Sequence, residues 1–205
     1  MYQIKCTYEG LAPMLQDRFF NPEEAEIGQA KLKGGKDKKK EVVLKLHRDK
    51  KGVFVPADVF RMMLIGNKAR PGAAKILGSY VETKKATEYV NVCESFIWTK
   101  GIENPLKVYI KPIRKTMDEV DERSFPTKGG GRLTAMRPVI SMPWTVTFII
   151  EVTDDHLVES KVREFYEVAG FRCGIGAHGP TFGRCRIIEW EVLSEPEKKS
   201  KRKKK

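Results

Sequence analysis

The sequence lacks a hydrophobic segment long enough to cross a membrane, since no apolar run approaches the roughly 20 residues that a spanning helix needs. Its first ten residues, MYQIKCTYEG, contain neither the basic start nor the apolar stretch of a secretory signal peptide. The four cysteines are scattered rather than paired in spacing, which favours reduced thiols over a disulfide framework or a zinc site. These absences predict a soluble chain in a cytoplasmic setting, with no membrane partner.

Histidine is also scarce, and the signatures of several enzyme classes are missing. There are three histidines and no G-x-S-x-G, Walker or H-E-x-x-H motif. His178 lies among glycines and arginines, where it could act as a general base in metal-independent RNA cleavage, or serve only as a hydrogen-bonding loop residue. The acidic run 118–122 could hold Mg²⁺, but such runs are usually only solvated. We therefore expect no cofactor, no metal and no catalytic residue, with His178 as the alternative.

Positive charge is abundant but unevenly distributed. The formal net charge is +12, of which residues 198–205 carry +7 and residues 31–40 carry +5. The rest of the chain is therefore close to neutral. Blocks of like charge are typical of flexible basic arms that contact nucleic acid, or of tails that only keep a protein soluble. A nucleic-acid site on the folded body must come from uneven placement of its charges.

Apolar patterns predict a single α+β domain over residues 1–193. Strands are expected where apolar residues alternate or β-branched residues cluster, at 2–8, 42–46, 53–55, 107–111, 144–152 and 184–192. Helical spacing predicts helices at about 58–68 and from a cap at Asp154 or Asp155 to Gly170, whereas 73–100 is ambiguous. The final order of strand, helix, loop and strand indicates half of a ferredoxin-like (RRM-like) antiparallel sheet.

Three segments are expected to leave this core. Residues 22–40 form a Gly/Lys-rich insertion, and residues 194–205 form a flexible basic tail. Residues 113–141 contain few large apolar side chains and a run of three glycines, which predicts a long excursion of the functional or disordered kind. Because the acids of this excursion cluster early, its later part is basic and supplies Lys128, Arg132 and Arg137.

The segment 170–184 is the most informative loop, because it holds five glycines in fifteen residues between a helix and a strand. Glycines at this density imply close approach by another backbone, a phosphate chain or a packed neighbour. Arginine forks for phosphates and aromatic rings for base stacking are the two parts of a single-strand binding surface. The candidate nucleic-acid contacts here are Phe171, Arg172, Gly174, Gly176, His178, Gly179, Phe182, Arg184 and Arg186. The alternative is a glycine-rich turn that merely packs tightly.

The stretch from Gly174 to Ile187, GIGAHGPTFGRCRI, resembles the C-terminal glycine-rich loop of the RAMP superfamily, the RNA-binding subunits of CRISPR effector complexes and their relatives. Residues 48–63 resemble the hairpin and helix start of backbone-type members, with Ala57 and Asp58 in place of a small polar pair. The resemblance implies a ferredoxin-like core with long insertions that holds RNA by its backbone. It also implies a thumb-like hairpin at 113–141, side-by-side assembly, and stand-alone relatives in phages and mobile elements.

The sequence thus predicts a non-enzymatic protein that binds single-stranded nucleic acid, with RNA favoured over DNA, through the glycine-rich loop and the basic excursion. The resemblance allows self-association or a place in a larger ribonucleoprotein, whereas its stand-alone relatives mean that membership in a CRISPR complex does not follow from it. Two alternatives stay open: a metal-independent endoribonuclease using His178, and a phage-type assembly or inhibitor protein that binds another protein.

Overall fold

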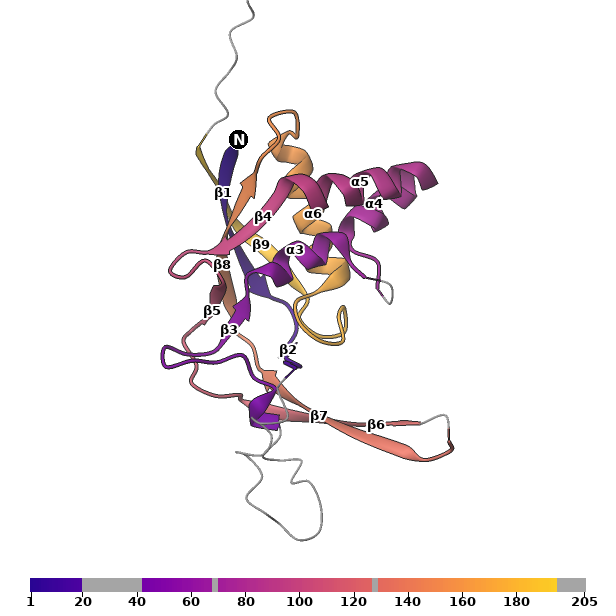
Figure 1. Cartoon of the computed structure of the whole chain (residues 1–205). Helices are drawn as coiled ribbons and strands as arrows, with labels where there is room; N and C mark the ends of the chain where they lie inside the picture. Colours follow the sequence, from indigo (N-terminus) through magenta and orange to yellow (C-terminus); the bar gives the residue numbers. More distant parts are fainter. Residues whose placement is uncertain (20–41, 68–69, 127–128, 195–205) are drawn as a thin grey trace, which may run out of the picture.

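The computed structural model describes residues 1–19, 42–67, 70–126 and 129–194 (Figure 1). Its main sheet is built on β1 (Tyr2–Gly10) and β8 (Thr145–Val152), in which alternate residues are fully buried. β1 pairs antiparallel with β8 on one side and with β9 (Cys185–Ser194) on the other, and β4 (Ile97–Gly101) pairs with the far edge of β8.

This strand order, β9-β1-β8-β4, is that of a ferredoxin-like sheet when the helices are placed along the chain. The helical segment α3 (Asp58–Ile65), α4 (Ala73–Val81) and α5 (Thr83–Phe96) connects β1 to β4, and α6 (Glu159–Val168) connects β8 to β9. The sheet is extended by β5 (Lys107–Lys111), which pairs with β8, and by β3 (Phe54–Pro56), which pairs with β5. The predicted α+β, ferredoxin-like fold class is confirmed.

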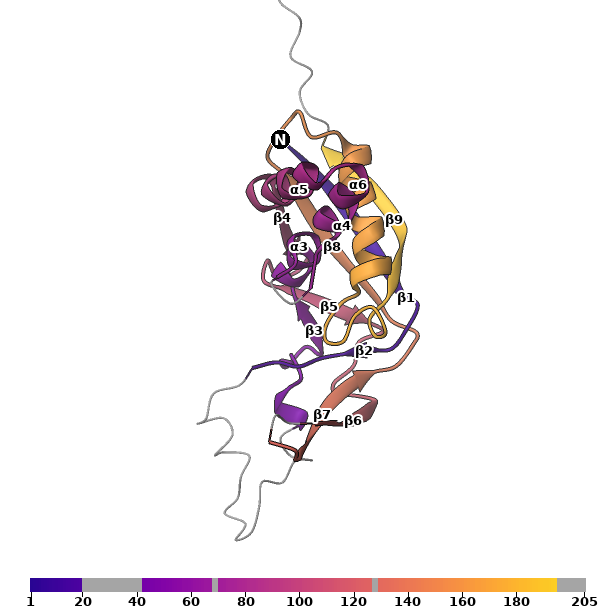
Figure 2. The same ribbon diagram turned by 90° about the vertical axis from the view of Figure 1, so that its right-hand side faces the viewer.

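Helices α3, α4, α5 and α6 cover one face of the main sheet (Figure 2). Aromatic rings fill the space between the layers: Phe60 of α3 stacks on Phe148 of β8 at 4.1 Å between centroids. The buried Tyr8 hydroxyl donates to the Tyr166 carbonyl at 2.6 Å, so its polar end is satisfied inside the core. The four cysteines are free thiols. Within the described part of the chain, no helix is both long enough and apolar enough to cross a membrane.

The excursion after β5 is a paired β-hairpin rather than an irregular loop. β6 (Glu119–Pro126) and β7 (Arg132–Ile140) pair antiparallel, and the short strand β2 (Met14–Leu15) pairs with the base of β7. In Figure 1 the hairpin extends away from the body on the side of the sheet that carries the helices. It thus has the thumb-like form that the family resemblance implied.

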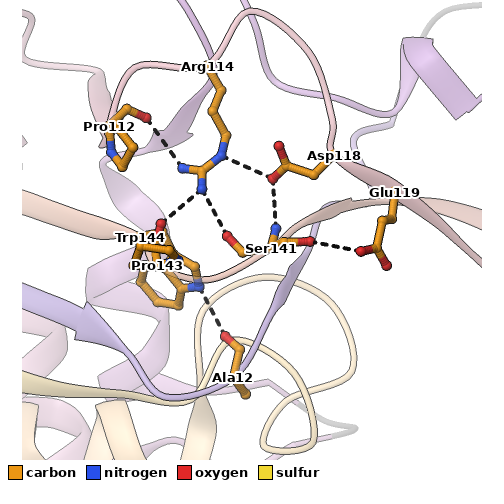
Figure 3. A network of polar contacts seen from close by, with 8 residues as sticks. All are labelled: Ala12, Pro112, Arg114, Asp118, Glu119, Ser141, Pro143 and Trp144. Atoms are coloured by element: carbon orange, nitrogen blue, oxygen red, sulfur yellow. Dashed lines mark hydrogen bonds and ion pairs between the residues drawn. The ribbon is translucent and has the colours of Figure 1, made fainter.

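Arg114 fixes the base of this hairpin to the main sheet (Figure 3). Its guanidinium donates to the carbonyls of Pro112, Ser141 and Pro143 at 3.3, 3.0 and 2.9 Å. It also pairs with the Asp118 carboxylate at 3.0 Å, and that carboxylate accepts the backbone N–H of Ser141. One side chain therefore ties together the chain segments that enter and leave the hairpin.

One expected strand is absent, and the bounds of two expected helices differ from the prediction. Residues 42–46 are not a strand, because residues 42–44 form a helical turn closed by the bond from Lys45 N–H to the Val42 carbonyl. Val42 and Leu46, at the start and just past the end of this turn, are both buried. At the hairpin expected around residues 48–52, Arg48 and Val53 form an isolated antiparallel β-bridge.

Helix α6 begins at Glu159 rather than at an Asp154 or Asp155 cap. The Asp154 carboxylate instead accepts the N–H of His156 in a local turn. The helix also does not end at Gly170. It continues as a π-helical turn (Ala169–Cys173) and stops at Gly174, which has φ +72°. α3 ends earlier than expected, at Gly66 with φ +79°. The ambiguous residues 73–100 form α4, α5 and most of β4.

We expect Arg114→Lys to lower the free energy of unfolding by about 2 kcal/mol, because an ammonium cannot reach three carbonyls and a carboxylate at once. Urea denaturation measures the change. Arg163→Lys is the matched control, since Arg163 is exposed and pairs with Glu167 alone, and it should cost less than about 0.5 kcal/mol. Equal midpoints for the two variants would show that the hairpin base does not depend on Arg114.

Candidate nucleic-acid interface

The glycine-rich loop lies against the segment that links β1 to β2. Ala177 N–H donates to the Leu15 carbonyl at 2.9 Å, and Gly183 N–H donates to the Pro13 carbonyl at 2.7 Å. In return, Leu11 N–H donates to the Arg184 carbonyl, and Ile175 is fully buried beneath the loop. Strand β2 is therefore paired with β7 on one edge and bridged to the loop on the other.

The glycines of this loop accommodate the protein's own backbone. Gly176 has φ +83°, and a Cβ there would collide with the Leu15 carbonyl oxygen. Gly183 has φ +68°, and a Cβ there would collide with the Ile175 carbonyl oxygen. Both positions require glycine for two reasons: the positive φ is unfavourable for other residues, and there is no room for a side chain. The close approach that the sequence predicted is thus at least partly internal, by a neighbouring chain segment.

A groove runs between this loop and α3. It consists of a cavity of about 270 Å³ beside β2 and a second of about 150 Å³ beside the end of α3. The two cavities share Val59 and Gly176 in their walls, so they are adjacent. We call this feature the α3 groove.

His178 begins the turn of the glycine-rich loop, residues 178–181, which we call the loop's turn. Three arginines from separate elements carry charges that act on it. Partial burial lowers the pKa of His178, and the positive charges of Arg137, Arg123 and Arg70 lower it further, whereas Asp121 opposes them. His178 itself has φ +56°, an uncommon conformation for a residue with a side chain. The loop's turn is therefore a region of positive potential, built by β6, β7 and the segment after α3.

The hairpin contacts the loop through Arg123 of β6. Its guanidinium carbon lies 4.8 Å from the centroid of the Phe182 ring, a cation–π contact, and Asp121 binds the other side of the guanidinium at 2.9 Å. On β7, Arg137 donates to the Asp17 carboxylate at 2.7 Å. Each arginine is thus oriented by a carboxylate, and Asp121 lies directly opposite Arg137 in the hairpin register.

The structure brings some of the predicted contact residues together and separates others. Those gathered at the loop's turn and the α3 groove are Arg137, Gly174, Gly176, His178, Gly179 and Phe182. Arg172 and Arg184 are exposed beside the loop, with the Arg184 guanidinium 5.7 Å from the Phe171 ring. Arg132 opens β7, and Lys128 lies outside the described residues.

Arg186 faces away from the groove. It lies opposite Glu9 on β1, on the sheet face without helices, and pairs with that carboxylate at 2.7 Å. On this face the central strands β1 and β8 present no aromatic side chain, and lysines such as Lys5 and Lys100 are engaged by glutamates. The central strands of the open face therefore lack the aromatic residues on which an RRM-like sheet stacks bases.

Sequence reasoning missed four residues of the site. Arg70 and Arg123 supply charge beside His178, and Gln16 and His47 line the larger cavity. An alternating Asp121-x-Arg123 pattern was readable as one face of a strand, but only once residues 119–126 were recognised as a strand. For Arg70, Gln16 and His47 no local pattern exists, because their proximity comes from tertiary packing.

No protein-family model and no curated protein matches the sequence. Among solved structures, 38 chains match. One is a chain of the Type III-B Cmr-beta complex bound to cognate target RNA, at 12% sequence identity and a TM-score of 0.54. The match covers 93% of this chain and 60% of that one, so this chain spans less than two thirds of that neighbour. The likeness shows that the two chains share a fold.

We expect Gly176→Ala to lower the free energy of unfolding by about 3 kcal/mol or more, because it adds a collision with Leu15 to an unfavourable dihedral. Gly130→Ala is the matched control. Gly130 has a similar φ of +78° but open space around it, so only the dihedral cost of about 1 kcal/mol applies. Chemical denaturation of both variants measures the difference, and equal losses would contradict the docked arrangement of the loop.

Proposed function

We propose that this chain is an RNA-binding subunit of a ribonucleoprotein of the RAMP kind, which holds single-stranded RNA in the α3 groove. The observation that carries the proposal is the convergence of Arg70, Arg123 and Arg137 on the glycine-rich loop at that groove. Cations above an apolar groove are the arrangement that a single strand needs, with phosphates outside and bases within. The shared fold with a chain of an RNA-bound complex supports the same conclusion.

The charge distribution supports binding here rather than on the open sheet face. Lys5 and Lys100 on that face are engaged in ion pairs between neighbouring strands, with Glu151, Glu189 and Glu191 as their partners. At the loop's turn, by contrast, the charges of three arginines act on one histidine, with Asp17 and Asp121 as counter-charges. Like charges held close together are costly in the free protein, and a phosphate placed among them relieves that cost.

We expect the double variant Arg70→Gln/Arg123→Gln to bind RNA at least tenfold more weakly near physiological salt, since each lost charge-assisted contact costs roughly 1.5–3 kcal/mol. The slope of log affinity against log salt should fall by about 0.7 for each phosphate contact removed from a single strand. Fluorescence anisotropy with labelled RNA and DNA of one sequence measures both quantities and the preference between them.

The matched control is Arg163→Gln/Lys84→Gln, which removes the same charge from exposed positions on α6 and α5. It should leave affinity within about twofold of the wild type, as expected for surface charges away from the site. Equal losses in the two double variants would mean that binding follows overall charge, and would contradict a site at the loop.

A pH dependence follows from the lowered pKa of His178. A bound phosphate beside the imidazole would raise that pKa, so RNA binding would take up a proton. Affinity should therefore increase as pH falls from 7.5 to 5.5, by up to about tenfold for each unit by which the phosphate raises the pKa. His178→Gln should flatten this profile without abolishing binding. RNA cleavage that disappears in His178→Gln would instead support the endoribonuclease alternative.

Neighbouring subunits are proposed as further partners, because both edges of the main sheet expose apolar side chains. On β9 these are Ile188 and Leu193, and beside β4 they are Trp98, Ile102 and Leu106. Two different edges on opposite sides of one sheet allow head-to-tail contacts that continue along a strand. Native mass spectrometry with RNAs of increasing length should show stepwise addition of protein copies. One copy at every RNA length would contradict this arrangement.

A further inference from the structure

The larger cavity of the α3 groove has walls unlike those of the basic region beside it. Its floor and sides are formed by apolar residues, among which Met14, Val55 and Ile175 are almost completely buried. Val59 of α3 separates it from the smaller cavity. Its polar groups come from one side, the segment after β2 and the turn after residues 42–44, which supply Gln16, Asp17 and His47.

These polar groups are held in fixed positions. The Gln16 side chain donates to the Phe54 carbonyl at 3.0 Å and accepts the backbone N–H of His47 at 2.7 Å, so both ends of its amide are used. The centroid of the His47 ring lies 5.8 Å from the centroid of the Phe54 ring. Burial, and to a smaller extent the nearby Arg18 charge, lower the pKa of His47, which keeps the imidazole neutral at pH 7. A neutral imidazole offers one donor and one acceptor.

Among the described residues that line this cavity, Asp17 alone is charged. The Asp17 carboxylate is bound by Arg137 at 2.7 Å and lies 3.8 Å from Lys45, while Arg70 lines the neighbouring cavity. An apolar interior with a neutral donor and acceptor does not suit a phosphate, which needs cations around it. It suits a flat, largely apolar group with a polar edge, whose attached phosphates remain at the basic rim.

We propose that this cavity receives one unpaired nucleobase of the bound strand, with His47 facing the base edge and Val59 against the base plane. The proposal rests on the RNA-binding function proposed above and deepens it. It makes the site selective for single strands, because a base within a duplex cannot enter without leaving its stack. It also makes affinity depend on the bases and not on the phosphate chain alone.

The test compares two single strands of about twelve nucleotides, within the length that one such domain covers. One is an oligoadenylate, and the other has the same ribose–phosphate chain without bases. The wild-type protein should bind the oligoadenylate at least about fivefold more tightly, the lower limit of what stacking one base contributes. Val59→Phe, which fills the cavity, should bring the two affinities together. Val81→Phe, the same replacement at an exposed position of α4 outside both cavities, should preserve the difference.

A spectroscopic measurement on the wild-type protein covers the case in which Val59→Phe fails to fold. A 2-aminopurine placed at successive positions of the strand should change its emission strongly at one position per bound protein, and His47→Leu should reduce that change. Equal binding of the two strands by the wild type would overturn the nucleobase proposal while leaving RNA binding intact. Failure to bind either strand would overturn the proposed function itself. Tight binding of free adenosine monophosphate without RNA would assign the cavity to a small nucleotide and overturn the proposal as well.

Discussion

The backbone pairing of β2 is the constraint on which the rest of the site depends. This two-residue strand bonds to β7 through Met14 and Leu15, and Leu15 also bridges Ala177 of the glycine-rich loop. A strand paired on both edges cannot shift relative to either neighbour without breaking hydrogen bonds. The hairpin and the loop are therefore held in one register. Glycine at position 176 is what allows the loop to come close enough for this pairing.

This register explains why arginines distant in the sequence meet at one place. Arg123 and Arg137 are carried on paired strands, and β2 holds the base of those strands beside the loop. Asp121 and Asp17 orient the two guanidinium groups before any ligand arrives, which lowers the entropy lost on binding. The same carboxylates compete with an incoming phosphate for the two guanidinium groups. Preorganisation of this kind favours a ligand that supplies several phosphates in a row, as a nucleic-acid strand does.

The sequence predicted the core well because alternation in β1 and β8 and the helical stripe of α6 are local signals. The fold class and the place of the glycine-rich loop follow from them. Two kinds of feature could not be derived in this way. Residues 42–46 have the composition of a strand, but Val42 and Leu46 are buried together on a helical turn. The hairpin strands at 119–140 lack an apolar face of their own and are stabilised by pairing and by Arg114, so only the family resemblance indicated them. The contact between Arg123 and Phe182 depends on the hairpin, because Arg123 lies on β6.

The central claim is that RNA lies on the helix-bearing side of the sheet, between α3, the glycine-rich loop and the hairpin. Ultraviolet crosslinking of the full chain to RNA, followed by mass spectrometry of the crosslinked peptides, tests it most directly. Crosslinks should concentrate in residues 55–72 and 171–184 and on the hairpin, with His178 and Phe182 among the modified positions. Crosslinks confined to the open sheet face, at residues such as Lys5, Tyr109 and Glu189, or to the lysine-rich runs alone, would contradict it.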